Sequence, residues 1–108
     1  MMRIVEKNKK IKMSELKKLA EEMFDILVKA VVDIEKEIMV VGGELHSDEE
    51  ALLLNLNSNQ KNLWGINLYP GEKEKFIEFD SIINIKPSFG NKSRDVENLE
   101  IKKKLKRL

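Results

Sequence analysis

The chain of 108 residues has no cysteine, one histidine, two prolines and few aromatic residues, which make up 6% of it. Without cysteine it has no disulfide bond, no thiolate nucleophile and no thiolate metal ligand. No apolar run approaches the roughly 18 residues that a membrane-spanning helix needs. The first twelve residues lack the apolar core of a signal peptide. We therefore expect a cytoplasmic protein with no membrane partner.

Charge is plentiful but unevenly distributed, although the net charge is only +1. Residues 1–18 carry seven Lys or Arg against two Glu, and residues 91–108 carry seven against three acids. Between them, residues 19–90 carry six Lys against fourteen Asp or Glu. The basic ends could bind nucleic acid, or they could pair with the acidic middle of the chain. We favour the second interpretation and do not expect a nucleic-acid partner.

Length and periodicity predict one α+β domain. A chain of this length can bury a single core, and the hydrophobic fraction of 42% suits a globular protein. Apolar residues recur every three or four positions in some segments and alternate in others. The first twelve residues suit either a short edge strand or a loosely attached arm. The predicted helices cover 14–27, 48–57 and 96–108, and the predicted strands cover 28–34, 38–42, 63–69 and 76–85.

These segments follow the order helix, hairpin, helix, hairpin, helix. Short turns join the strands of each pair, so we expect about four mainly antiparallel strands. The helices are expected to pack against the apolar side of the strands. Residues 1–13 then form a basic N-terminal arm, and residues 14–108 form the single domain. The pattern does not decide whether the two hairpins share one sheet.

His46 is the only histidine, and it lies between a glycine pair and an acidic helix start. A lone histidine is a weak metal signature, and no HExxH motif, EF-hand spacing or Cys/His cluster accompanies it. Asp33, His46 and Asp80 could nevertheless act with a divalent metal in a small hydrolase or nuclease. We keep this enzyme as the alternative function, and we expect no resident metal and no cofactor.

A polar series interrupts the apolar residues between positions 80 and 94. Asp80 and Asn84 are four residues apart on a predicted strand and therefore share a face. The following loop can fold Arg94 back over that face, either as a structural clamp on Asp80 or as part of a pocket beside Gly65. In the second case Arg94 would bind an anionic group. The predicted ligand-binding residues are Asp80, Asn84, Ser93 and Arg94.

These patterns favour a non-enzymatic binding or interaction module over an enzyme. The loop 88–95 contains Ser, Asn, Lys and Arg donors just before a predicted helix, which are the elements of an anion site. The expected partner is a small anionic ligand such as a nucleotide, or another protein.

Four stretches of the sequence can be compared with known families: KAVVD from Lys29, GGELH from Gly42, LWGINLYP from Leu63, and the segment 80–97. Together they resemble a family of small prokaryotic domains of unknown function. The resemblance covers about residues 14–105 and leaves the basic arm outside. It implies the domain boundaries but brings no activity, substrate or cofactor with it.

Overall fold

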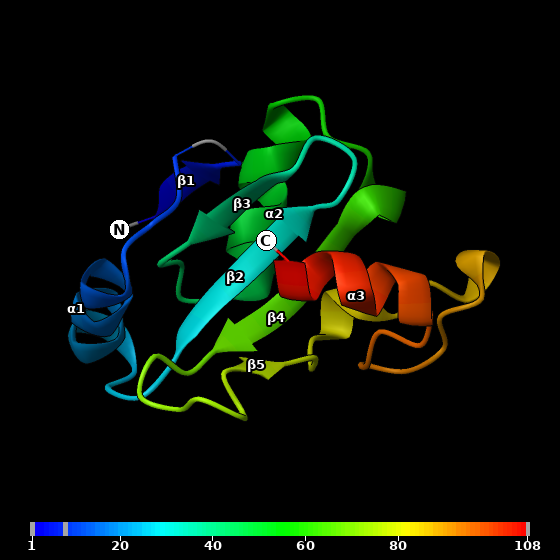
Figure 1. Cartoon of the computed structure of the whole chain (residues 1–108). Coiled ribbons are helices and arrows are strands. Elements are labelled where there is room, and N and C mark those ends of the chain that lie inside the picture. Colours follow the sequence, from blue (N-terminus) through cyan, green and yellow to red (C-terminus); the bar gives the residue numbers. More distant parts are fainter. Residues whose placement is uncertain (1, 8, 108) are drawn as a thin grey trace.

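The computed structural model describes residues 2–7 and 9–107, which form an α+β domain (Figure 1). No helix in this part of the chain is long and apolar enough to cross a membrane. The strands are β1 (Arg3–Glu6), β2 (Val28–Asp33), β3 (Ile38–Val41), β4 (Leu63–Leu68) and β5 (Ile77–Glu78). The helices are α1 (Met13–Met23), α2 (His46–Asn55) and α3 (Leu99–Arg107), with single 3₁₀ turns at Gln60–Asn62, Ile82–Asn84 and Pro87–Phe89.

The strands form one antiparallel sheet in the order β1-β3-β2-β4-β5. β2 pairs along its whole length with β4, so the two hairpins share one sheet. The α+β prediction is confirmed, but the count of four strands was too low. Residues 3–6 add β1 to the edge of β3, so the element order begins with a strand.

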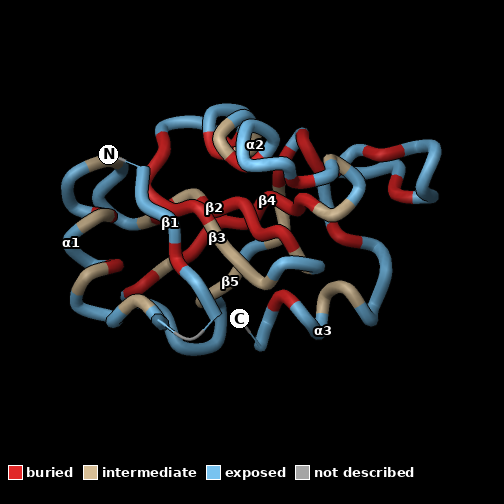
Figure 2. The backbone as a smooth tube through the Cα atoms, turned by 90° about the horizontal axis from the view of Figure 1, so that it is seen from above, coloured by how far each residue is buried: buried red, intermediate tan, exposed pale blue. Residues whose placement is uncertain are grey.

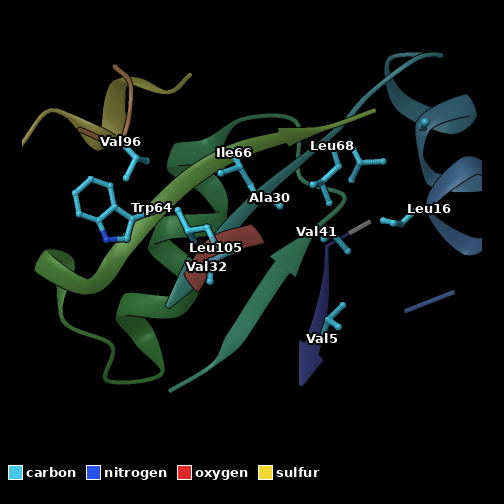
Figure 3. Packing of buried hydrophobic residues seen from close by; sticks show 12 residues of the cluster. Val5, Leu16, Ala30, Val32, Val41, Trp64, Ile66, Leu68, Val96 and Leu105 are labelled. Atoms are coloured by element: carbon cyan, nitrogen blue, oxygen red, sulfur yellow. The ribbon is translucent and has the colours of Figure 1, made fainter. Parts of the chain in front are cut away.

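Helices cover both faces of the sheet, and the molecule has three layers (Figure 2). On one face, α1 and α3 contribute Leu16 and Leu105 to a cluster that also contains Trp64 and Ile66 of β4 (Figure 3). On the other face, Leu53 of α2 packs in a smaller, separate cluster. The core therefore lies on both sides of the sheet.

The prediction of helices on a single apolar side was incomplete because the central strand is apolar on both sides. Ala30, Val31 and Val32 follow one another in β2, and all three are fully buried. A strand that is apolar on both sides needs cover on both sides. The chain supplies that cover with α2 on the face of Val31 and with α1 and α3 on the face of Ala30 and Val32.

The predicted strand 76–85 is wrong beyond its start. β5 pairs with β4 only at Ile77 and Glu78, and the chain then turns into a 3₁₀ helix. The side chain of Asn84 takes the place of the missing strand, because its Oδ1 accepts from the Gly65 amide at 2.7 Å and its Nδ2 donates to the Gly65 carbonyl at 3.0 Å. Gly65 is required here, since a Cβ would lie 2.6 Å from Ser81.

Candidate functional site

A group of polar side chains gathers on the side of the sheet that faces α2, near the start of that helix. The sheet register places Lys29 of β2 opposite Asn67 of β4. Because side chains alternate along a strand, both point to the same side as Val31 and Leu63, which pack beneath α2. We call this group the polar face, and it consists of Lys29, His46, Asn67, Tyr69, Glu78, Asp80 and Arg94.

His46 is the first residue of α2 and is buried against β4. Its Nε2 lies 2.8 Å from the carbonyl oxygen of Ile66. A carbonyl oxygen can only accept, so Nε2 carries the hydrogen and Nδ1 holds the lone pair of the neutral ring. Burial lowers the pKa of His46, and the positive charges of Lys29 and Arg94 lower it further, although the Ile66 carbonyl and Asp80 oppose them. The ring is therefore neutral at pH 7.

Asn67 and Tyr69 converge on one carboxylate at the edge of the sheet. Asn67 Nδ2 donates to Glu78 Oε1 at 2.9 Å, and the Tyr69 hydroxyl donates to the same oxygen at 3.1 Å. Burial and the hydrogen bond to Glu78 raise the pKa of Tyr69. Asn67 Oδ1 is buried and has no hydrogen-bond partner among the described residues. A buried polar atom without a partner is uncommon, and the structure has others at Asp33, Glu49, Ser58 and Trp64.

Arg94 reaches the polar face from the loop before α3. Its Nε donates to Asp80 Oδ1 at 2.6 Å, and the two side chains are 54% and 47% exposed. The backbone of Arg94 is fixed as well, because its carbonyl accepts from the Ser81 amide and from Asn84 Nδ2. The guanidinium is thus held at one nitrogen while half of the side chain stays in solvent.

The four predicted ligand-binding residues do not form one cluster. Asp80 and Arg94 are in contact on the polar face. Asn84 is fully buried beneath them, where its side chain joins β4 to the Arg94 backbone. Ser93 turns the other way and donates from Oγ to Glu97 Oε2 at 2.7 Å. That bond and a second one from the Lys92 amide lower the pKa of Glu97.

One buried amide shapes the loop that carries Arg94. Asn91 Nδ2 lies within hydrogen-bonding distance of the carbonyls of Asn84, Ser93 and Asp95, and its Oδ1 accepts from the Glu97 amide. A single side chain therefore satisfies backbone groups on both sides of Arg94. This explains how a segment without regular secondary structure can position the guanidinium.

The structure does not assemble Asp33, His46 and Asp80 into one centre. Asp33 Oδ1 accepts from the amides of Glu35 and Lys36, so this carboxylate caps the turn between β2 and β3. Asp33 pairs with Leu63, whereas the carbonyl bound by His46 lies three residues further along β4, about 10 Å away. Within 2–7 and 9–107, no group of three or more His, Asp or Glu side chains could hold a metal ion.

Sequence reasoning missed Glu49, which is fully buried one turn after His46. Its Oε2 accepts from the Gly43 amide at 3.0 Å, and a Cβ on Gly43 would lie 2.6 Å from Glu49 Cγ. Burial raises the pKa of Glu49 to about 9, so the carboxyl is protonated at neutral pH. Helical spacing could have indicated this position, because Glu49 precedes the buried Leu53 by four residues.

Comparison with known proteins agrees with the resemblance seen in the sequence. A family model described as "Protein of unknown function (DUF5674)" matches residues 3–108. The match includes β1 and most of the basic arm, which the resemblance had left outside. No curated protein and no solved structure matches the chain.

Proposed function

We propose that this chain, which belongs to the DUF5674 family of proteins of unknown function, binds a small anionic ligand at its polar face. A phosphate or carboxylate group of the ligand would contact Arg94. Lys29 would add a second positive charge from the floor of the site. This is a binding function and requires no chemical step.

The observation that carries the proposal is the way Arg94 is held. Arg94 donates to Asp80 through Nε. An arginine that binds a phosphate or carboxylate with two hydrogen bonds also uses the Nη donors of its guanidinium. Those Nη donors belong to a side chain that is half exposed, so a ligand can reach them. A guanidinium fixed before binding loses less conformational entropy when the ligand arrives.

The two cations of the polar face, Lys29 and Arg94, equal its two carboxylates, Asp80 and Glu78, in number, so an anion would bind through direct contact with the cations and not through net charge. Glu49 is protonated and His46 is neutral at pH 7, so neither repels a negative group nor draws it away from Arg94. Asp80 is already paired, and Glu78 accepts hydrogen bonds from Asn67 and Tyr69. Lys29 lies close enough to His46 and Glu49 to affect the pKa of both.

The test is a titration of the ¹⁵N-labelled protein with inorganic phosphate and then with a nucleoside monophosphate, followed by NMR. We expect shifts in the amide signals of His46, Asp80 and Arg94. The variant Arg94→Gln should lose these shifts while its spectrum stays folded. Lys92→Gln is the matched control, because Lys92 is an exposed cation of the same loop and has no ion pair among the described residues.

Two results would oppose the proposal. The first is the absence of any shift at the polar face when both probes are present at millimolar concentration. The second is an equal loss of binding in Lys92→Gln and Arg94→Gln, which would mean that the charge of the loop acts without a specific site.

A further inference from the structure

The two basic ends of the chain lie on the same face of the sheet, opposite the polar face. Residues 2–12 and residues 99–107 each carry five Lys or Arg against a single Glu. Val5 and Ile11 from the first segment and Ile101 and Leu105 from the second belong to one hydrophobic cluster. Figure 2 draws α3 and the chain leading into α1 on the same side of the sheet.

Pairing with acids leaves much of this charge uncompensated. Arg3 pairs with Glu15 and Lys7 pairs with Glu37, while in α3 Lys102 contacts Asp95 and Lys103 contacts Glu100. Six further cations of the two segments are exposed and have no ion pair among the described residues. We call these six the basic surface: Lys9, Lys10, Lys12, Lys104, Lys106 and Arg107.

The sequence around the basic surface indicates the kind of polyanion that it fits. Residues 1–23 and 90–108 contain no Phe, Tyr or Trp. The Phe79 ring reaches α3 from another segment, but it is partly buried and lies 5.0 Å from Lys102 Nζ, so it offers little free surface for stacking on the bases of a single strand. Contacts from Lys or Arg to phosphates fix a protein on the duplex but carry no sequence information. The apolar side of α3 is turned into the core at Leu105, so it is not free to enter a lipid bilayer.

We propose that the basic surface binds the phosphate backbone of duplex nucleic acid without regard to base sequence. The proposal departs from our expectation from the sequence, in which the charged ends pair with the acidic middle of the chain and no nucleic-acid partner is expected. The proposal does not depend on the ligand of the polar face, because the two surfaces lie on opposite sides of the sheet.

Binding is measured by fluorescence anisotropy of a short labelled DNA duplex at increasing salt. If all six cations contact phosphates, affinity falls by about 10³ between about 50 mM and about 200 mM salt. Changing the duplex sequence should leave the affinity unchanged. No binding at the lowest salt, or an affinity that does not respond to salt, would overturn the proposal.

Three triple variants locate the binding surface, and each removes three charges. The tail variant replaces Lys104, Lys106 and Arg107 with Gln, which keeps good helix formers in α3. The head variant replaces Lys9, Lys10 and Lys12 with Gln. Each should reduce the slope of log affinity against log salt by about 2.7. The control variant replaces the exposed residues Lys61, Lys73 and Lys75 with Gln.

The control variant should bind the duplex as the parent does. Equal weakening in all three variants would mean that overall charge, and not this surface, attracts the duplex, and it would refute the proposal. A parallel arm uses vesicles that contain phosphatidylserine. Binding to those vesicles that is lost in the tail variant, without binding to the duplex, would assign the surface to membranes and overturn the proposal.

Discussion

The two faces of the sheet are closed in different ways. The face toward α1 and α3 is covered by one apolar cluster that extends from Val5 at one edge to Val96 near the other. The face toward α2 has a smaller apolar centre around Leu53, which gives way to the polar face where α2 begins. The first face is closed mainly by apolar packing, although Trp64 Nε1 is buried there without a hydrogen-bond partner among the described residues. The second holds a buried histidine, a protonated glutamate and an unpaired amide oxygen, which packing alone does not explain.

The largest expected effect concerns the apolar centre beneath α2. Leu53→Ala should lower the free energy of unfolding by about 2–5 kcal/mol, because a fully buried leucine leaves a cavity. The neighbouring Leu54 is exposed, and Leu54→Ala should cost about 0.5 kcal/mol or less. Urea unfolding measures both. Equal losses of stability in the two variants would mean that Leu53 of α2 is not buried against this face of the sheet.

Next in size is the junction between the sheet and the loop that carries Arg94. Asn84→Ala should cost about 2–3 kcal/mol, because it leaves the buried Gly65 amide and carbonyl without their partner and removes one of the two hydrogen bonds to the Arg94 carbonyl. Ser93→Ala removes an exposed hydrogen bond and should cost far less. If the two variants unfold at the same urea concentration, Asn84 does not hold the loop.

Glu49 should make stability depend on pH. In the unfolded chain the pKa of Glu49 has its ordinary value of 4.5, whereas the folded protein keeps the proton up to about pH 9. Between these values the folded state binds more protons, so stability falls as pH rises. Glu49→Gln mimics the protonated acid and should be more stable than the parent at pH 8, with a smaller difference at pH 5.

The matched control for this pH dependence is Glu44→Gln, because Glu44 is exposed beside the same glycine pair. It should follow the parent at both pH values. A Glu49→Gln variant with the parent's pH dependence would show that Glu49 is ionised in the folded protein.

The smallest expected effect is that of the ion pair on the polar face. Arg94→Ala should cost about 1 kcal/mol or less, because both partners are half exposed and water screens their attraction. Chemical denaturation of this variant, compared with Lys92→Ala, measures the difference. A loss of stability as large as that of Asn84→Ala would mean that the role of Arg94 is mainly structural.

The sequence predicted the elements that depend on local patterns and missed those that depend on distant partners. The alternation of side chains from Val28 and from Leu63 predicted the strands β2 and β4, because this pattern can be read from neighbouring residues alone. The same alternation misled at Asn84, where a side chain from outside the sheet replaces a strand partner of β4. Charge and length alone could not tell that residues 3–6 would pair with β3.

The candidate site was predictable to a similar degree. Loop length and opposite charge suggested the contact between Asp80 and Arg94, which the structure contains. The approach of Lys29 to Asn67 depends on the register of β2 against β4, which no local pattern specifies. Helical spacing indicates which side of α2 Glu49 lies on, but its burial also depends on the missing side chain of Gly43, which no local pattern specifies.

The most direct test of the central claim is thermal unfolding of the parent and of Arg94→Gln, each with and without phosphate. A ligand that binds only the folded state raises the melting temperature. Phosphate should therefore raise the melting temperature of the parent and leave that of Arg94→Gln unchanged, while the variant alone melts within about 8 °C of the parent. A parent that does not respond to phosphate, together with a variant that melts far lower, would contradict the account and reduce the polar face to a structural clamp.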